Sequence, residues 1–257
     1  MITLTSDFGL KDPYVAEIKG VILTINPNAT IVDLTHGVEK FNIRMGAFML
    51  SSAAPYFPKG TVHLGVVDPG VGTERRAILV QTKQGFFVGP DNGVLMLAAQ
   101  NQGIEHTYEL TNSKFMLAQV SSTFHGRDVF APAAAHLDMG VKPSEFGPEI
   151  IDVTTPEFAK VERRNGSFIG EVLHVDSFGN IITNINQKEV ANAKTVKVKL
   201  QNVSLNLTFG KTYAQTKPQE PIALIGSHGF LEIALNQASA AEKFHVKTGD
   251  KIEATPA

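Results

Sequence analysis

The first 140 residues alternate between short β-prone runs and helical stripes of apolar side chains, and this order constrains the fold most strongly. A β-prone run at 2–5 precedes apolar residues at helical spacing over 13–25. The same order repeats as a strand over 29–34 and a helical stripe over 43–54. The next run, 61–67, is apolar enough for a strand buried on both faces. Strands that alternate with helices predict an α/β layer with a mainly parallel sheet.

The rest of this first part continues the same pattern. The runs 77–81 and 85–88 read as a hairpin pair, a helix starts near 94, and a last helix covers 132–139 before Gly140. These elements complete the predicted N-terminal α/β domain, to which we assign residues 1–155.

The last 90 residues have a different character, because their β-prone runs are short and no long helical stripe separates them. These runs cover 168–175, 181–185, 195–200, 203–209, 222–225 and 230–235. The last two flank Gly226-Ser227-His228-Gly229, a four-residue hairpin signal. We therefore predict a smaller C-terminal domain over 166–257 that is antiparallel and barrel-like, with a loop-rich boundary near 150–166.

Composition removes several classes of function. Lys and Arg total 23 against 25 Asp and Glu, and a nucleic-acid-binding protein usually has a basic excess. Cysteine is absent, so disulfides and Cys-ligated metals are excluded. No stretch approaches the roughly 18 apolar residues of a membrane span, and the first residues lack a signal-peptide pattern. We expect a cytoplasmic protein that binds neither nucleic acid nor membrane.

Three polar residues follow predicted strands, where open α/β sheets bind their ligands. They are Asp7, His36 and Asp68, and Asp68 is followed by the loop Pro69-Gly70-Val71-Gly72. Each has an alternative structural role: Asp7 as a helix cap, His36 as a hydrogen-bonded buried histidine, and Asp68 as a turn residue. The sequence alone leaves both possibilities open.

Common catalytic motifs are missing, but three further polar clusters are present. The chain has no P-loop, no GxSxG elbow and no HExxH, and its Gly70-Val71-Gly72 lacks the third glycine of a dinucleotide fingerprint. The segment 124–128 combines a histidine, a cation and a carboxylate, where Asp128 could simply cap a helix. The segments 176–180 and 226–229 could be turns, and the aromatic residues Phe41 and Phe178 could pack in a core or stack on a flat ring.

In order along the chain, these clusters resemble the S-adenosylmethionine (SAM) hydrolase, or SAM hydroxide adenosyltransferase, family, whose relatives include the SAM-dependent fluorinase and chlorinase. Seven segments carry the resemblance: 5–9, 32–36, 67–72, 89–93, 123–128, 176–180 and 226–229. The resemblance implies an α/β domain, a β-barrel-like domain and a homotrimer. It also implies active sites between the N-terminal domain of one subunit and the C-terminal domain of its neighbour.

The resemblance also implies roles for individual residues. Asp68, Arg75 and His125 match the catalytic set of the hydrolase branch, and Asp7 matches the carboxylate that holds both ribose hydroxyls. The remaining substrate-binding residues that it implies are Phe41, Gly126, Asp176, Phe178, Asn180, Ser227 and Glu232. Among these, Asp176 matches a residue at the methionine ammonium, Ser227 one near the methionine carboxylate, and Phe178 and Asn180 adenine-side contacts. No metal ligand and no cofactor is implied, since SAM is the substrate.

Water is the nucleophile that the resemblance implies, because the halogenating relatives have a tyrosine where this chain has Asp68. The implied reaction converts SAM and water into adenosine and L-methionine by displacement at the ribose 5′-carbon. His125 is the member of the set whose ordinary pKa, about 6.5, suits proton uptake near neutral pH. Arg75 stays protonated and would position the water.

Three alternatives remain at this stage. The protein could be a metal-dependent hydrolase that uses Asp7, His36, Asp68 and His125 as ligands. It could be a SAM-dependent halogenase, or a non-catalytic protein that binds adenosine or SAM in the same pocket.

Overall fold

The computed structural model describes residues 1–190, 193–200 and 203–257, and the chain forms two compact units. The first unit is Met1–Pro156 and the second is Glu157–Ala257. The sequence analysis placed the two domains at 1–155 and 166–257. Within the described residues, no helix has the length and apolar character needed to cross a membrane.

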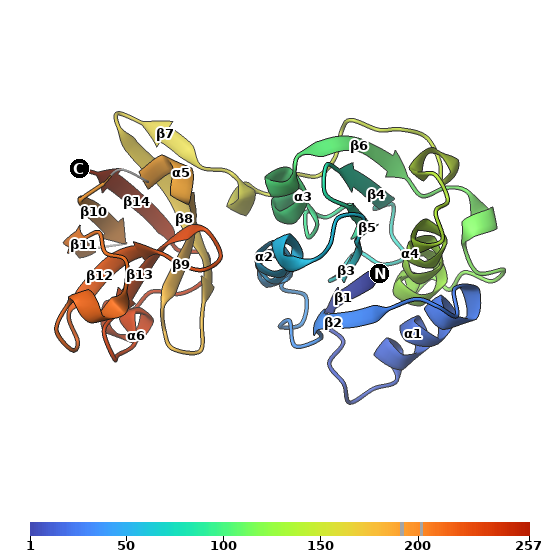
Figure 1. The fold of residues 1–257 in the computed structure, drawn as a ribbon, viewed down its shortest axis with the longest axis horizontal. Coiled ribbons are helices and arrows are strands. Elements are labelled where there is room, and N and C mark those ends of the chain that lie inside the picture. The colour runs from blue at the N-terminus through green and yellow to red at the C-terminus, as the bar shows by residue number, and fades with distance from the viewer. Residues whose placement is uncertain (191–192, 201–202) are drawn as a thin grey trace. The chain divides into compact units, whose positions relative to one another are not determined.

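The first unit is built on a six-stranded sheet in the order β2-β1-β3-β5-β4-β6 (Figure 1). The pairs β1–β2, β1–β3 and β3–β5 are parallel, whereas β4 pairs antiparallel with β5 and β6. The predicted mainly parallel sheet is therefore confirmed. The strands are β1 (Ile2–Ser6), β2 (Ile31–Thr35), β3 (Val62–Val66), β4 (Ala77–Thr82), β5 (Phe86–Pro90) and β6 (Ile104–Glu109).

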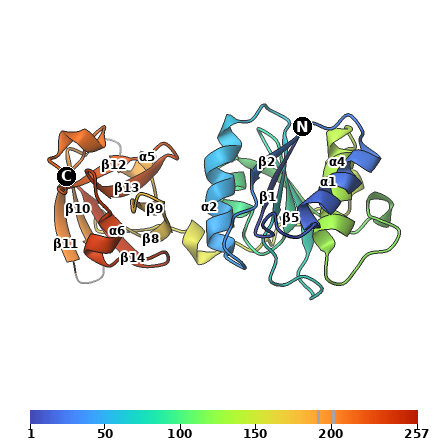
Figure 2. The ribbon, with the colours of Figure 1, turned by 90° about the horizontal axis from the view of Figure 1, so that it is seen from below.

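Helices cover both faces of this sheet, and Figure 2 shows α2 on one side and α1 with α4 on the other. One core includes Ile18 and Ile22 of α1, and a second includes Leu50 of α2. Burial of these apolar stripes is the main stabilising contribution to the helices. The helices are α1 (Tyr14–Ile25), α2 (Ile43–Ala53), α3 (Met96–Gln102) and α4 (Ala131–Asp138).

A topological switch point lies between β1 and β3. The chain leaves β1 through α1 to reach β2 on one side, and returns through α2 to β3 on the other side. Helices α1 and α2 lie on opposite faces of the sheet, so the connections that leave β1 and β2 run to opposite faces. Open α/β sheets bind their ligands at the carboxyl ends of the strands near such a switch point. Every residue of β1 and β3 is buried, as predicted for the run at 61–67.

The second unit is an antiparallel sheet in the order β11-β10-β14-β8-β9-β13-β12, with β7 paired to β8. A bridge between Phe209 and Ala223 brings the two end strands together, so the sheet nearly closes into a barrel, as expected. The strands are β7 (Glu162–Arg164), β8 (Ser167–Val175), β9 (Ile181–Asn186), β10 (Thr195–Leu200), β11 (Val203–Thr208), β12 (Pro221–Ile225), β13 (Phe230–Leu235) and β14 (Lys251–Pro256). Two short helices, α5 (Gln187–Val190) and α6 (Ala240–Phe244), accompany them.

The structure adds elements that the sequence analysis did not predict. Strands β6, β7 and β14 were missed because their exposed, charged positions dilute the apolar alternation. A π-helix over Gly126–Phe130 precedes α4, so the helical run begins earlier than the predicted residue 132. Single-turn 3₁₀ helices occur at Ala54–Tyr56, Ser113–Phe115, Pro143–Glu145, Glu157–Ala159 and Tyr213–Gln215.

Candidate active site

A cavity of about 390 Å³ opens at the switch point of the first unit. Asp7 reaches it from the end of β1 and Asp68 from the loop after β3. Five residues that the sequence analysis proposed line this one cavity: Asp7, Phe41, Asp68, His125 and Gly126. Because parallel strands place their carboxyl ends at one edge, residues 61 positions apart meet here.

Arg75 joins Asp68 to His125 in a continuous chain of polar contacts. Its Nε donates to both carboxylate oxygens of Asp68 at 3.0 Å, and one terminal nitrogen donates to Asp68 Oδ2 at 2.5 Å. The same nitrogen lies 2.8 Å from His125 Nδ1. The Asp68 and Arg75 side chains are only 6% and 10% exposed, so little water competes for these contacts.

The contact with Arg75 constrains the tautomer of His125. A guanidinium only donates hydrogen bonds, so Nδ1 must be the acceptor and a neutral ring then has its proton on Nε2. Burial and the Arg75 charge lower the pKa of His125 from its ordinary value, against the opposing effects of Asp68 and Asp128. His125 is therefore neutral near pH 7 and presents an Nε2–H donor.

Asp7 is buried, and part of its hydrogen-bonding capacity orders the neighbouring loop. Its Oδ2 accepts from the backbone N–H of Phe41 at 2.8 Å, and its backbone carbonyl accepts from Lys40 Nζ at 2.6 Å. Phe41 has a positive φ of 64° and its side chain is largely exposed. A carboxylate can accept several donors, so Asp7 can still bind hydroxyl groups of a ligand. The structure gives no helix-capping role to Asp7, because α1 begins after Pro13.

His36 does not line this cavity, although it follows β2. Its ring is buried, with Nδ1 2.7 Å from Ser6 Oγ and Nε2 3.1 Å from Asp33 Oδ1. It therefore has the structural role that the sequence analysis left open. Among the residues that the structure describes, no group of three or more His, Asp or Glu side chains is arranged to hold a metal ion.

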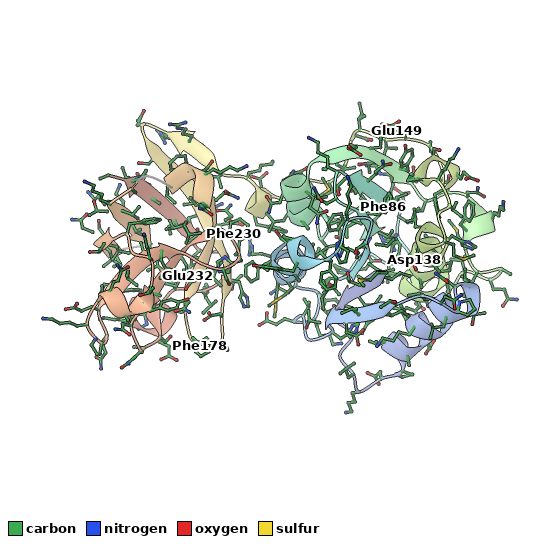
Figure 3. All side chains as sticks on the ribbon, viewed as in Figure 1. Phe86, Asp138, Glu149, Phe178, Phe230 and Glu232 are labelled. Carbon is green, nitrogen blue, oxygen red and sulfur yellow. The ribbon has the colours of Figure 1, made fainter. Side chains whose placement is uncertain are left out.

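The second unit holds a larger cavity, of about 600 Å³, which Asp176, Phe178 and Asn180 line. Asp176 Oδ1 accepts from the backbone N–H groups of Phe178 and Asn180, both at 2.9 Å, and its Oδ2 accepts from Asn180 Nδ2. These contacts fix the turn between β8 and β9, and Phe178 is 78% exposed at the periphery of the unit (Figure 3).

Two other predicted residues, Ser227 and Glu232, do not line the 600 Å³ cavity. Ser227 is exposed in the turn between β12 and β13. Glu232 is buried inside the unit (Figure 3) and accepts a hydrogen bond from the Tyr213 hydroxyl at 2.8 Å. Tyr213 does line the cavity, so Glu232 reaches it only through Tyr213. Burial and the nearby Glu232 raise the pKa of Tyr213.

Sequence reasoning missed several residues that line the two cavities. Phe8 and Phe124 stood inside the quoted segments 5–9 and 123–128, so their motifs could have indicated them. Tyr14, Lys40 and Tyr213 lie outside every motif, and no local pattern marks them. The structure alone places Tyr14 against Phe124, with ring centroids 5.2 Å apart.

Comparison with protein families identifies the chain. Residues 2–147 match the SAM hydroxide adenosyltransferase N-terminal domain, and residues 170–253 match the C-terminal domain of the same family. The chain belongs to the SAM hydroxide adenosyltransferase family. The two matches correspond to the two structural units, so the family resemblance drawn from seven short segments is confirmed.

Individual members of the family are similar over nearly the whole chain. A (R)-S-adenosyl-L-methionine hydrolase of Thermus thermophilus is 41% identical, with 95% of each chain covered. A fluorinase of an Actinoplanes species is 29% identical over 100% of this chain and 98% of its own. The solved structure of an uncharacterized conserved protein from Thermotoga maritima superposes with a TM-score of 0.88, at 41% identity, covering 99% of this chain and all of that one.

Proposed function

We propose that this protein hydrolyses S-adenosyl-L-methionine to adenosine and L-methionine. The observation that carries the proposal is the contiguous Asp68–Arg75–His125 set, which borders a cavity that also holds Asp7. The greater similarity to a SAM hydrolase than to a fluorinase supports water rather than a halide as the nucleophile.

The reaction is a displacement at the ribose 5′-carbon. A water oxygen forms a bond to this carbon while the carbon–sulfur bond breaks and its electron pair stays on sulfur. The sulfonium becomes the neutral thioether of methionine, and the water gives up one proton, which is released to the solvent. Since a thioether leaves without protonation, the site needs no general acid, and catalysis rests on alignment of oxygen, carbon and sulfur.

Asp7 would bind the ribose and so fix the 5′-carbon. Its Oδ2 is already held by Phe41 N–H, which orients the carboxylate before substrate arrives. In the second unit, Asp176 would bind the methionine ammonium and Ser227 would lie near the methionine carboxylate. Phe178 and Asn180 would contact the adenine, with Phe41 as a further aromatic neighbour and Gly126 and Glu232 completing the site.

Arg75 would position the attacking water and favour hydroxide character in the low-dielectric cavity. Asp68 holds the guanidinium through both of its carboxylate oxygens. Proton uptake by His125, the role expected from its ordinary pKa, requires a free ring nitrogen. Because Nδ1 faces Arg75 and Nε2 bears the proton, His125 would first have to leave Arg75. In the present arrangement its Nε2–H would donate a hydrogen bond to the water.

The wider setting is also proposed. The protein would be a cytoplasmic homotrimer with sites between the first unit of one subunit and the second unit of its neighbour. It would use no cofactor and no metal, and would bind neither nucleic acid nor membrane.

Product analysis of SAM incubated with the protein in oxygen-18 water tests this function. We expect equimolar adenosine and methionine, with one label in adenosine, no requirement for halide, and no loss of activity with chelator. Unlabelled adenosine would exclude attack at the 5′-carbon. A 5′-halo-adenosine as the main product would indicate a halogenase, and SAM that stays intact beside stoichiometric protein would indicate a binding protein.

A further inference from the structure

Asp128 is the most deeply buried carboxylate beside the candidate site, and the mechanism above gives it no role. It lies in the π-helix Gly126–Phe130, three residues after His125, and its exposure is 0%. A buried carboxylate is costly unless charged or polar partners compensate for lost water. The hydrogen-bond partners of Asp128 therefore indicate which segments this carboxylate holds in place.

The Asp128 side chain connects the helical run to the segment that precedes it. Oδ2 accepts from the backbone N–H of Ser121 at 2.8 Å, and Oδ1 accepts from Arg127 Nε at 2.6 Å. The Asp128 backbone carbonyl also accepts from Leu117 N–H at 2.9 Å. Through these bonds Asp128 holds Leu117 and Ser121 against the start of the π-helix.

This segment contacts the loop that bears Asp68 and Arg75. A Cβ placed on Gly72 would lie 2.3 Å from the Ser122 carbonyl oxygen, so the two backbones are in close contact. Gly72 also has a φ of +77°, which other residues rarely adopt. A shift of Ser121 and Ser122 would therefore be transmitted to the loop 68–75.

The helix of Asp128 contacts Arg75 at two positions. His125, immediately before it, meets the guanidinium through Nδ1, and the Phe130 ring lies 5.3 Å from the guanidinium carbon. Arg75 is thus held between Asp68 on its own loop and the π-helix. The position of that helix decides whether Arg75 can hold Asp68 and His125 at the same time.

We propose that Asp128 is a positioning residue, which holds the Ser121–His125 segment and the π-helix so that Arg75 stays aligned between Asp68 and His125. The proposal rests on the proposed SAM hydrolysis. It assigns Asp128 no contact with substrate. Against the lowering by burial and Arg75, the negative charges of Asp68 and Asp128 also raise the pKa of His125.

The test compares Asp128→Asn with Asp138→Asn. Asp138 ends the same helical run, is only 11% exposed, and pairs with the N-terminal amine and with Asn26, away from the cavity. The two variants make the same chemical change, so any general loss of stability affects both. We expect Asp128→Asn to lower kcat about a hundredfold, with KM for SAM changed less than about threefold, and Asp138→Asn to keep kcat within about twofold of the wild type.

A second measurement does not depend on activity. Nitrogen-15 NMR of labelled histidines, with His125 assigned from His125→Asn, gives its pKa in each protein. We expect the pKa of His125 to fall in Asp128→Asn and to stay unchanged in Asp138→Asn. If the wild type releases no adenosine, the proposed function fails, and this titration still decides whether Asp128 acts on His125.

The proposal is overturned if Asp128→Asn keeps kcat within about twofold of the wild type, or if the His125 pKa is the same in both variants. Equal losses of kcat in the two variants would also overturn it. Should Asp128→Asn not fold, Arg127→Gln replaces it, because it removes the Arg127 bonds to both Asp128 oxygens and leaves the Ser121 contact. The variant also removes the Arg127–Glu17 ion pair, so Glu17→Gln is measured beside it and is expected to keep kcat within about twofold. For Arg127→Gln we expect a fall in kcat of about tenfold at unchanged KM, and an unchanged kcat would reject the proposal.

Discussion

Arg75 is the residue that connects Asp68 and His125, two of the residues that line the first cavity. It is held by Asp68 and in turn sets which nitrogen of His125 is the acceptor. One guanidinium can hold Asp68 and His125 at the same time because its N–H donors form a rigid planar fork. His125 is then fixed in tautomer as well as in position, which a histidine alone would not achieve.

Substitutions of His125 separate a donor role from a base role. A Gln amide nitrogen can occupy the Nε2 position, whereas an Asn amide reaches only the Nδ1 position. We expect His125→Asn and His125→Ala to lose about 10²–10³ in kcat and His125→Gln to lose less, while all three still bind adenosine. Steady-state kinetics and adenosine calorimetry measure this. Equal losses in Gln and Asn variants would favour proton uptake by His125.

His63 of strand β3 is buried like His36, and its contacts lie within the sheet and not at the cavity. Its Nδ1 lies 2.8 Å from Thr3 Oγ1 on β1, and its ring stacks on Phe87 of β5 with centroids 4.9 Å apart. Burial lowers the pKa of His63 to about 4. Above about pH 4 the ring is therefore neutral in the folded sheet.

This burial predicts an acid-sensitive first unit. Above about pH 6.5 the ring is neutral in both states; as pH falls from there towards about 4, the unfolded chain takes up the proton first and stability is lost. The loss is of the order of 3 kcal/mol. Urea unfolding between pH 4 and 7 measures it, and His63→Gln, which does not titrate, is expected to flatten that part of the profile. An unchanged slope in the variant would contradict this.

The turn between β8 and β9 depends on Gly179. Its φ is +80°, and a Cβ there would lie 2.1 Å from Ser239 Oγ and 2.8 Å from Ser239 Cα. Gly179→Ala must therefore displace the turn that Asp176 organises. We expect KM for SAM to rise about tenfold, which corresponds to about 1.4 kcal/mol of binding, with kcat changed much less. Gly166→Ala, also at positive φ but with open space around it, is the matched control.

At the scale of the whole molecule, the proposed site needs both units. Asp68 belongs to the first unit and Asp176 to the second, and each lines a separate cavity. If active sites form between neighbouring subunits of a trimer, two inactive variants can complement each other. A wild-type first unit from one chain then meets a wild-type second unit from another.

Mixed assemblies test this arrangement. Asp68→Ala and Asp176→Ala are each expected to be nearly inactive, with Asp68→Ala still binding adenosine. Co-expressed in equal amounts, they should recover about a quarter of the wild-type activity, because a quarter of randomly formed sites contain no substitution. Light scattering gives the mass of the assembly. No recovery from a mixed trimer would place each site within one chain.

The sequence by itself indicated most of the elements and the candidate catalytic residues. Periods of 2 and 3.6 are local properties of the chain, so the main strands and helices could be predicted from them. The motifs likewise indicated Asp7, Asp68 and His125 before any fold was known, and the family resemblance implied Arg75. The strands β6 and β14 were not predicted, because exposed charged positions weaken their apolar pattern.

Only the tertiary structure decided how these residues act. His36 and Asp7 both follow strands and are both buried, yet the His36 ring contacts Ser6 whereas Asp7 lines the cavity. The tautomer of His125 depends on Arg75, 50 positions away in the chain. Such contacts depend on the order of the strands and on the face of the sheet that each crossover helix covers. Both are set by packing between distant segments, so no local sequence pattern predicts them.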